Sequence, residues 1–163
     1  MWDDAYIEQA RSDWGVYQVL VKNACSACHQ LHYLQMTVEK LGKAALLRSG
    51  IPLHNVRGTH RAFVRFMQLS ARSRALQREF RMNARQLQAY IQGLLPIANQ
   101  IERLAPALAQ GGPNAEYPWE VPTGQVLTPA SYRFPIAQNL KEQNGRKLLL
   151  FIKILLDKFD HLF

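Results

Sequence analysis

The chain has only two cysteines among its 163 residues, Cys25 and Cys28, and they stand three positions apart. A bridge between such close positions joins no distant parts of a fold, so a disulfide framework is not indicated. The longest apolar run, Leu148 to Leu156, is interrupted by Lys153 and has about half the length that a membrane helix needs. The first residues are acidic and polar and lack the basic start and apolar run of a secretory signal. We therefore expect a cytoplasmic protein with reduced thiols and no membrane helix.

Strand-like alternation of apolar and polar residues is also missing, as are internal repeats. Apolar residues recur instead at every third or fourth position, which is typical of helices with one buried face. This spacing predicts a first helix over residues 3–21 and a second over residues 23–48, which Gly50 and Pro52 would end. We expect one all-α domain over residues 1–163, an up-and-down helical bundle of four to five main helices.

The helices after Gly50 are less clearly bounded. Thr59 is a suitable N-cap for a third helix, and the apolar pattern continues as far as Leu94 and should end before Pro96. The pattern leaves open whether residues 59–94 form one bent helix or two. A shorter helix is expected over residues 97–109, and a last one over residues 139–163. The apolar face of the last helix comprises Leu148, Ile152, Leu155, Phe159 and Leu162.

Residues 111–135 differ from the rest, because they hold five of the eight prolines. This composition excludes helix for most of the segment. Aromatic residues argue against a disordered linker, so we expect an ordered loop that straps the bundle before the last helix. Tyr117 and Trp119 in this loop have two possible roles. They cover the core, which is the commoner role of such residues, or they stack on nucleic-acid bases.

A cysteine-histidine cluster, Cys25, Cys28, His29 and His32, follows helical spacing and would lie on one side of the second helix. Its Cys-x-x-Cys-His order also matches the attachment motif of c-type haem. Four ligands spread over two turns extend roughly 10 Å along a helix, too far for one tetrahedral metal ion. The favoured interpretation is packing, with Cys28 in the core and Cys25 half-buried, and we expect no cofactor. A metal site or a haem stays open as an alternative.

The net charge of +8 is concentrated in one stretch of the chain. Residues 57–85 contain eight arginines, no lysine and a single acid, Glu79. Guanidinium groups hold phosphate with two parallel hydrogen bonds, so this stretch points to RNA, DNA or nucleotide phosphates. The predicted contact residues are Arg61, Arg65, Arg74, Arg78, Arg81 and Arg85, the last four as one continuous helical ridge. The alternative is a solvated face, or pairing with acids of a partner subunit or of the last helix, such as Glu142, Asp157 and Asp160.

Four segments together resemble the HEPN family of helical, nucleotide-associated domains. Residues 5–14 are similar to its opening "W-x-x-x-A-x-x-D", and residues 24–45 to its second helix, "A-C-x-x-x-Q-x-x-x-E-K-x-x-K-A". Residues 58–63 resemble its "T/A-H-D-L" step, and residues 132–135 its "A-R-Y-P". The resemblance implies a homodimer, and a nucleotidyltransferase or an antitoxin as a possible partner. It favours a binding protein of a toxin-antitoxin or defence pair.

Many HEPN members are metal-independent ribonucleases with Arg-x4-6-His motifs, in which histidine moves a proton and arginine stabilises charge on the phosphate. The last helix of this chain lacks that motif, because no histidine follows Arg146 at the right spacing. The candidate catalytic residues are therefore His60, His54, Arg57 and Arg48, of which Arg48 and His54 alone have the formal spacing. Ribonuclease activity from a displaced or degenerate site is the second hypothesis.

Overall fold

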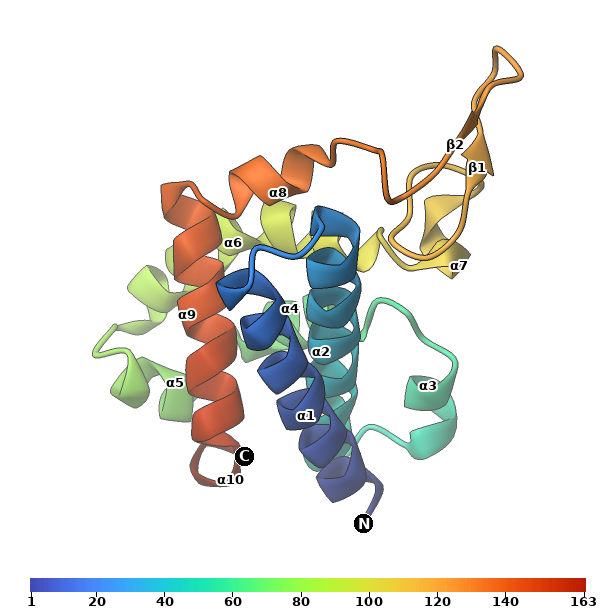
Figure 1. Cartoon of the computed structure of the whole chain (residues 1–163). Coiled ribbons are helices and arrows are strands. Elements are labelled where there is room, and N and C mark those ends of the chain that lie inside the picture. Colours follow the sequence, from blue (N-terminus) through green and yellow to red (C-terminus); the bar gives the residue numbers. More distant parts are fainter.

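Ten helices make up the architecture, and the only sheet is a short antiparallel hairpin (Figure 1). The structure is a computed structural model that describes residues 1–163. The elements are α1 (Trp2–Lys22), α2 (Ala27–Arg48), α3 (Leu53–Arg57), α4 (Ala62–Ser70), α5 (Arg74–Glu79), α6 (Ala84–Glu102), α7 (Pro106–Ala109), β1 (Trp119–Glu120), β2 (Val126–Leu127), α8 (Pro135–Asn139), α9 (Gln143–Asp157) and α10 (Phe159–Leu162). The all-α class expected from the sequence is confirmed.

Helices α1 and α2 lie side by side in opposite directions (Figure 1). Ala24 adopts a left-handed conformation with φ of 49°, and the Cys25 N–H donates to the carbonyl of Leu20 at 3.0 Å. This arrangement closes the end of α1, so the second helix begins at Ala27 and not near Asn23 as predicted. Gly50, with φ of 85°, ends α2 as predicted.

Helix α4 crosses α2 at a very short distance. A Cβ atom on Gly42 would lie 2.4 Å from the backbone nitrogen of Phe63, so only glycine permits this approach. The crossing is part of a continuous apolar core to which α1, α2, α4, α6 and α9 all contribute. The largest fully buried side chains of this core are Phe63, Phe151, Phe159, Leu31, Leu34, Leu41, Leu46, Met67, Leu76, Leu87, Ile91 and Leu94.

Residues 59–94 form parts of three helices, α4, α5 and α6, whereas the sequence pattern had left open whether they form one helix or two. Thr59 is not the N-cap of α4; that position is Arg61. The predicted end before Pro96 is wrong, because α6 continues to Glu102 with Pro96 inside it. The ring of Pro96 faces outward and costs one backbone hydrogen bond, while Ile97, Ala98 and Ile101 extend the buried stripe beyond it.

The predicted last helix is divided into α8, α9 and α10. Gly145 lies so near the preceding turn that a Cβ atom there would lie 2.2 Å from the carbonyl oxygen of Asn139. All five residues of the predicted apolar face are buried, namely Leu148, Ile152, Leu155, Phe159 and Leu162. None of the helices combines the length and apolar composition that crossing a membrane requires.

The proline-rich segment 111–135 is ordered and largely non-helical, as predicted, but it contains the hairpin β1–β2, which the sequence did not indicate. Gly124, with φ of 82°, lies in its turn. The hairpin extends away from the helices (Figure 1), while the base of the segment packs on the core. Trp119 and Phe134 are buried there, whereas Tyr117 is 60% exposed. The core-covering role thus holds for Trp119 and not for Tyr117.

Candidate functional site

Three of the predicted phosphate-binding residues gather on one surface, which we call the arginine face: Arg74, Arg78 and Arg81. All three are exposed, and together they line an open depression with Gln77 and Met82. A neighbouring depression again includes Arg78 and Arg81, together with Glu79 and with Lys158 and His161 from the chain's end. The arginine face is therefore built by α5, the turn after it, and the C-terminal residues.

The continuous helical ridge predicted from Arg74 to Arg85 is wrong, because two helices meet within it. Arg81 has φ of 52°, and the Met82 N–H donates to the carbonyl of Gln77 at 2.8 Å, which closes α5. Asn83 then caps α6 with reciprocal hydrogen bonds to Gln86 at 2.9 Å. The bend brings Arg81 beside Arg74 and Arg78, while Arg85 lies on α6 outside both depressions.

No carboxylate forms an ion pair with the arginine face. None of its three guanidinium groups forms an ion pair, and Glu79, the nearest acid in sequence, is held by Lys158 Nζ at 2.6 Å. Of the acids suggested as partners, Asp157 pairs with Lys153 and Asp160 with Arg11 and Arg48, while Glu142, the N-cap residue of α9, forms no ion pair with any arginine. The cationic surface is left free for external anions.

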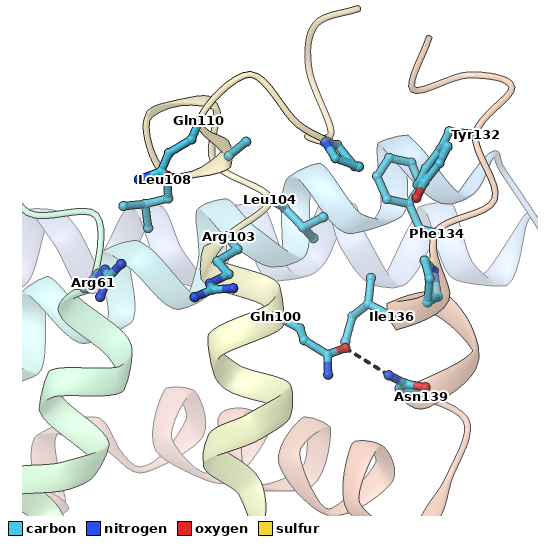
Figure 2. A pocket seen from close by; sticks show the side chains of 13 residues that line it. Arg61, Gln100, Arg103, Leu104, Leu108, Gln110, Tyr132, Phe134, Ile136 and Asn139 are labelled. Atoms are coloured by element: carbon cyan, nitrogen blue, oxygen red, sulfur yellow. Dashed lines mark hydrogen bonds between the residues drawn. The ribbon is translucent and has the colours of Figure 1, made fainter. Parts of the chain in front are cut away.

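A second concave region, the α6–α8 pocket, has a volume of about 570 Å³ (Figure 2). It lies between the end of α6, the short helix α7 and the segment leading into α8. Arg61, predicted as part of the phosphate surface, lines this pocket together with Arg103, whereas Arg65 is exposed on α4 outside it. Leu104, Phe134 and Ile136 provide a buried apolar wall. The six predicted arginines are therefore divided between separate surfaces.

A buried carboxylate lies under the start of α4. Glu102, at the end of α6, is 1% exposed, and its Oε1 accepts from the backbone N–H groups of Phe63 at 2.8 Å and Val64 at 3.0 Å. Its Oε2 has no hydrogen-bond partner. Burial raises the pKa of this carboxyl to about 7, although the two N–H groups and the charge of Arg61 act in the opposite direction.

His60 lies beside a second acid, with Nδ1 3.4 Å from Glu39 Oε2. Glu39 also accepts from Lys43 Nζ at 2.8 Å and from the Gln35 amide at 2.9 Å. Burial alone would raise the pKa of the Glu39 carboxyl, but Lys43, Gln35 and His60 outweigh it and hold that pKa below its ordinary value. The neighbouring Lys40 binds the buried Asp13 of α1 at 2.6 Å. These residues thus tie α2 to its neighbours.

The other candidate catalytic residues do not join His60 in one site. Arg48 is paired with Asp3 at 2.7 Å and Asp4 at 2.9 Å, so its guanidinium is already engaged by carboxylates. His54 is exposed on α3. The guanidinium carbon of Arg57 lies 4.9 Å from the ring centre of Trp2, in a cation–π contact.

The cysteine-histidine cluster is divided between two elements. Cys25 belongs to the turn after α1, so the prediction that all four residues share one helix is wrong. Cys28 is 3% exposed and packs in the core, while His29 is exposed and His32 Nδ1 lies 3.5 Å from Glu116 Oε1. No three His, Cys, Asp or Glu side chains converge as a metal site. A covalently attached haem does not fit either, because the Cys28 thiol is enclosed by core side chains.

Two residues that matter in this geometry had no part in the sequence predictions. Glu102 follows Ile97, Ala98 and Ile101 on the buried stripe, and an acid that continues an apolar stripe is a readable signal of a buried carboxylate. Arg103 carries no local signal, because its pocket is completed by residues about 30 positions later. Comparisons of the chain with protein-family models, curated proteins and solved structures find no match.

Proposed function

We propose that this chain is a HEPN-like helical bundle that binds nucleic acid or nucleotides through phosphate contacts at the arginine face. The single observation that carries the proposal is the convergence of Arg74, Arg78 and Arg81, none of which forms an ion pair, while the adjacent Glu79 is paired with Lys158. Guanidinium groups placed in this way repel one another until an anion neutralises them, and a phosphate backbone supplies regularly spaced anions.

The backbone of Arg81 adds support. A left-handed residue at the end of a helix is usually glycine, because a Cβ atom costs roughly 1 kcal/mol there. This chain has arginine at that position, with φ of 52°. Ala24 and Gln110 share this conformation, so strain alone does not mark a site, but at Arg81 the side chain adds a third guanidinium to the arginine face.

The direct test is charge reversal, with Arg78→Glu and Arg81→Glu variants measured against a labelled single-stranded RNA by fluorescence anisotropy. Each change should lower the affinity about tenfold at low salt and flatten its salt dependence. Arg146→Glu is the matched control, because Arg146 is an exposed arginine on α9 outside both depressions. Equal RNA affinity for all three variants, with unchanged thermal stability, rejects the proposal.

Pairing into a homodimer, and association with a nucleotidyltransferase or antitoxin, belong to the same proposal and rest on the resemblance of residues 5–68 to the HEPN family. Three apolar side chains are exposed near the end of α1, Val16, Val19 and Val21, and Leu150 of α9 lines the same shallow depression as Val21. Sedimentation equilibrium tests the dimer directly. A monomer at all accessible concentrations contradicts this part and leaves phosphate binding standing.

A metal-independent ribonuclease is the second candidate, and the contact between His60 and Glu39 favours it. A carboxylate beside Nδ1 orients an imidazole and leaves Nε2 for proton transfer, and the His60 side chain is 41% exposed. The adjacent Arg61 is exposed and free of ion pairs, so it is the cation nearest in sequence for a transition-state phosphate.

Incubation of the protein with mixed RNA in the presence of a chelator tests this candidate. Cleavage by the unaltered protein that is lost in His60→Ala and kept in His54→Ala supports it, since His54 is exposed on a separate helix. RNA that stays intact, or cleavage that ignores the His60 change, eliminates it. Neither result alters the expected loss of RNA binding in Arg78→Glu.

A further inference from the structure

The α6–α8 pocket combines a cationic side with an apolar wall (Figure 2). Arg61 and Arg103 lie at the same side of the cavity, and no Asp or Glu is among the residues that line it. Neither arginine forms an ion pair with any part of the chain. The pocket therefore carries two guanidinium groups, neither of which is in an ion pair.

The fold does not need the Arg103 side chain to complete α6. The backbone N–H of Arg103 donates to the carbonyl of Asn99, and the next two N–H groups donate to the carbonyls of Ile101 and Glu102. These bonds occupy the last carbonyls of the helix, which a basic side chain would otherwise satisfy. The charge of Arg61 acts on the buried Glu102, whereas Arg103 has no such internal role. Arg103 is thus the free cation of the pocket.

The opposite wall suits a flat apolar group. Tyr132 and Phe134 meet edge to face, with ring centres 4.9 Å apart and planes at 84°, and Trp119 also contacts Tyr132 edge to face, with ring centres 5.0 Å apart. Phe134 and Leu104 are buried in the core, so this wall is fixed by packing. Aromatic and aliphatic walls of this kind contact the planar or apolar body of a ligand.

An amide pair sits at the base of the pocket. Asn139 Nδ2 donates to Gln100 Oε1 at 2.9 Å, which joins α8 to α6 (Figure 2). The remaining Gln100 N–H groups and the Asn139 carbonyl oxygen have no partner within the chain, so a donor and an acceptor stay available side by side. A volume of about 570 Å³ lies within the range of small-molecule sites.

We infer that the α6–α8 pocket binds a small organic anion, whose phosphate or carboxylate is held by Arg61 and Arg103 and whose flat body rests on Tyr132, Phe134 and Leu104. This site contains none of the residues of the arginine face and is independent of nucleic-acid binding there. Two sources share the chemistry, a nucleoside monophosphate and an aromatic carboxylate.

Isothermal titration with AMP, 2-naphthoate and inorganic phosphate tests the inference. At least one organic probe should bind with a Kd below about 1 mM, and inorganic phosphate at least tenfold more weakly because it lacks the apolar body. Binding of AMP alone assigns the pocket to nucleotides, and binding of naphthoate alone assigns it to aromatic carboxylates. Phosphate binding as tight as that of either organic probe would overturn the inference.

Arg103→Ala should lower the affinity for the organic probe about tenfold, as expected for the loss of one charge-assisted hydrogen bond, while Arg146→Ala should leave that affinity unchanged. Leu108→Glu places an acid inside the pocket on the four-residue helix α7 and should abolish binding. Thermal unfolding shows whether each variant is folded. Absence of binding by both organic probes, or affinity that ignores both pocket substitutions, refutes the site. RNA binding by Arg103→Ala should remain at the level of the unaltered protein.

Discussion

Glu102 should make the stability of the protein fall as the pH rises from about 4.5 to about 7. The unfolded carboxyl has its ordinary pKa of 4.5, and burial raises the folded value to about 7. Between these values the folded protein keeps a proton that the unfolded chain has released, so unfolding releases a proton and becomes more favourable with rising pH. The stabilisation is complete below pH 4.5 and is lost as the pH passes 7.

The magnitude follows from the size of the shift. One pKa unit corresponds to 1.36 kcal/mol, so the difference between 4.5 and about 7 amounts to about 3 kcal/mol of unfolding free energy. This is a large share of the roughly 5–15 kcal/mol that stabilises an ordinary domain. Glu102 is almost fully buried, so little of the effect is screened by solvent.

Glu102→Gln isolates the effect, because the Gln carbonyl oxygen can still accept the two N–H bonds at the start of α4 but cannot titrate. Urea unfolding of both proteins should be followed by circular dichroism from pH 5 to pH 8. The difference in unfolding free energy, unaltered protein minus variant, should fall by about 2–3 kcal/mol over this range. All other titrating groups cancel in that difference, including Glu39, whose lowered pKa acts at more acidic pH. A difference that is constant with pH, or that increases, refutes the buried-carboxylate reasoning.

Three further predictions concern single substitutions. Arg81→Gly should relieve the left-handed strain and raise the unfolding free energy by about 0.5–1 kcal/mol, yet weaken RNA binding; lower stability in urea would contradict the strain argument. Gly42→Ala should lower the unfolding free energy by about 2–3 kcal/mol, because the added Cβ meets the backbone of α4. The control is Gly93→Ala on α6, where the space is open and the unfolding free energy should rise by about 1 kcal/mol. Equal shifts in melting temperature for the two variants would be inconsistent with this packing. Lys40→Met leaves Asp13 buried without its charge partner and should lower the unfolding free energy by about 3 kcal/mol. Calorimetry of the double variant Lys40→Met with Asp13→Leu should show that part of this loss is recovered. A double variant no more stable than Lys40→Met contradicts the prediction.

The helices that the sequence predicted well are those with long apolar stripes and a local end signal. Helices α1 and α2 have such stripes, and the left-handed Gly50 ends the second of them. The break between α5 and α6 also had a local signal, the Asn83-x-x-Gln86 capping pair, which the regular spacing of the arginines obscured. The prediction that a helix ends before Pro96 was wrong, because burial of the apolar residues after Pro96 outweighs the one backbone hydrogen bond that the proline removes.

The sites were less predictable for a different reason. The arginine face depends on a turn that moves Arg81 off the helical ridge, and the α6–α8 pocket joins residues 61, 100–110 and 132–139. Glu102 caps a helix that begins 40 residues earlier in the chain. Contacts between such distant positions leave no spacing pattern in the sequence. Composition could therefore indicate an arginine-rich binding protein, but it could not show that the arginines lie on two separate surfaces.

The distribution of ion pairs in the fold explains why the arginines of both surfaces are available to bind anions. Among the arginines, only Arg11 and Arg48 form ion pairs, although four of the lysines do. Most of the acids form ion pairs with other groups, and some of these pairs join helices, such as Asp13 with Lys40 and Glu79 with Lys158. Guanidinium cannot relieve mutual repulsion by losing a proton, since it stays protonated in proteins. Counter-ions for the unpaired arginines therefore come from outside the chain, and Arg74, Arg78 and Arg81 on one surface and Arg61 and Arg103 on another lie in hollows that could receive such anions.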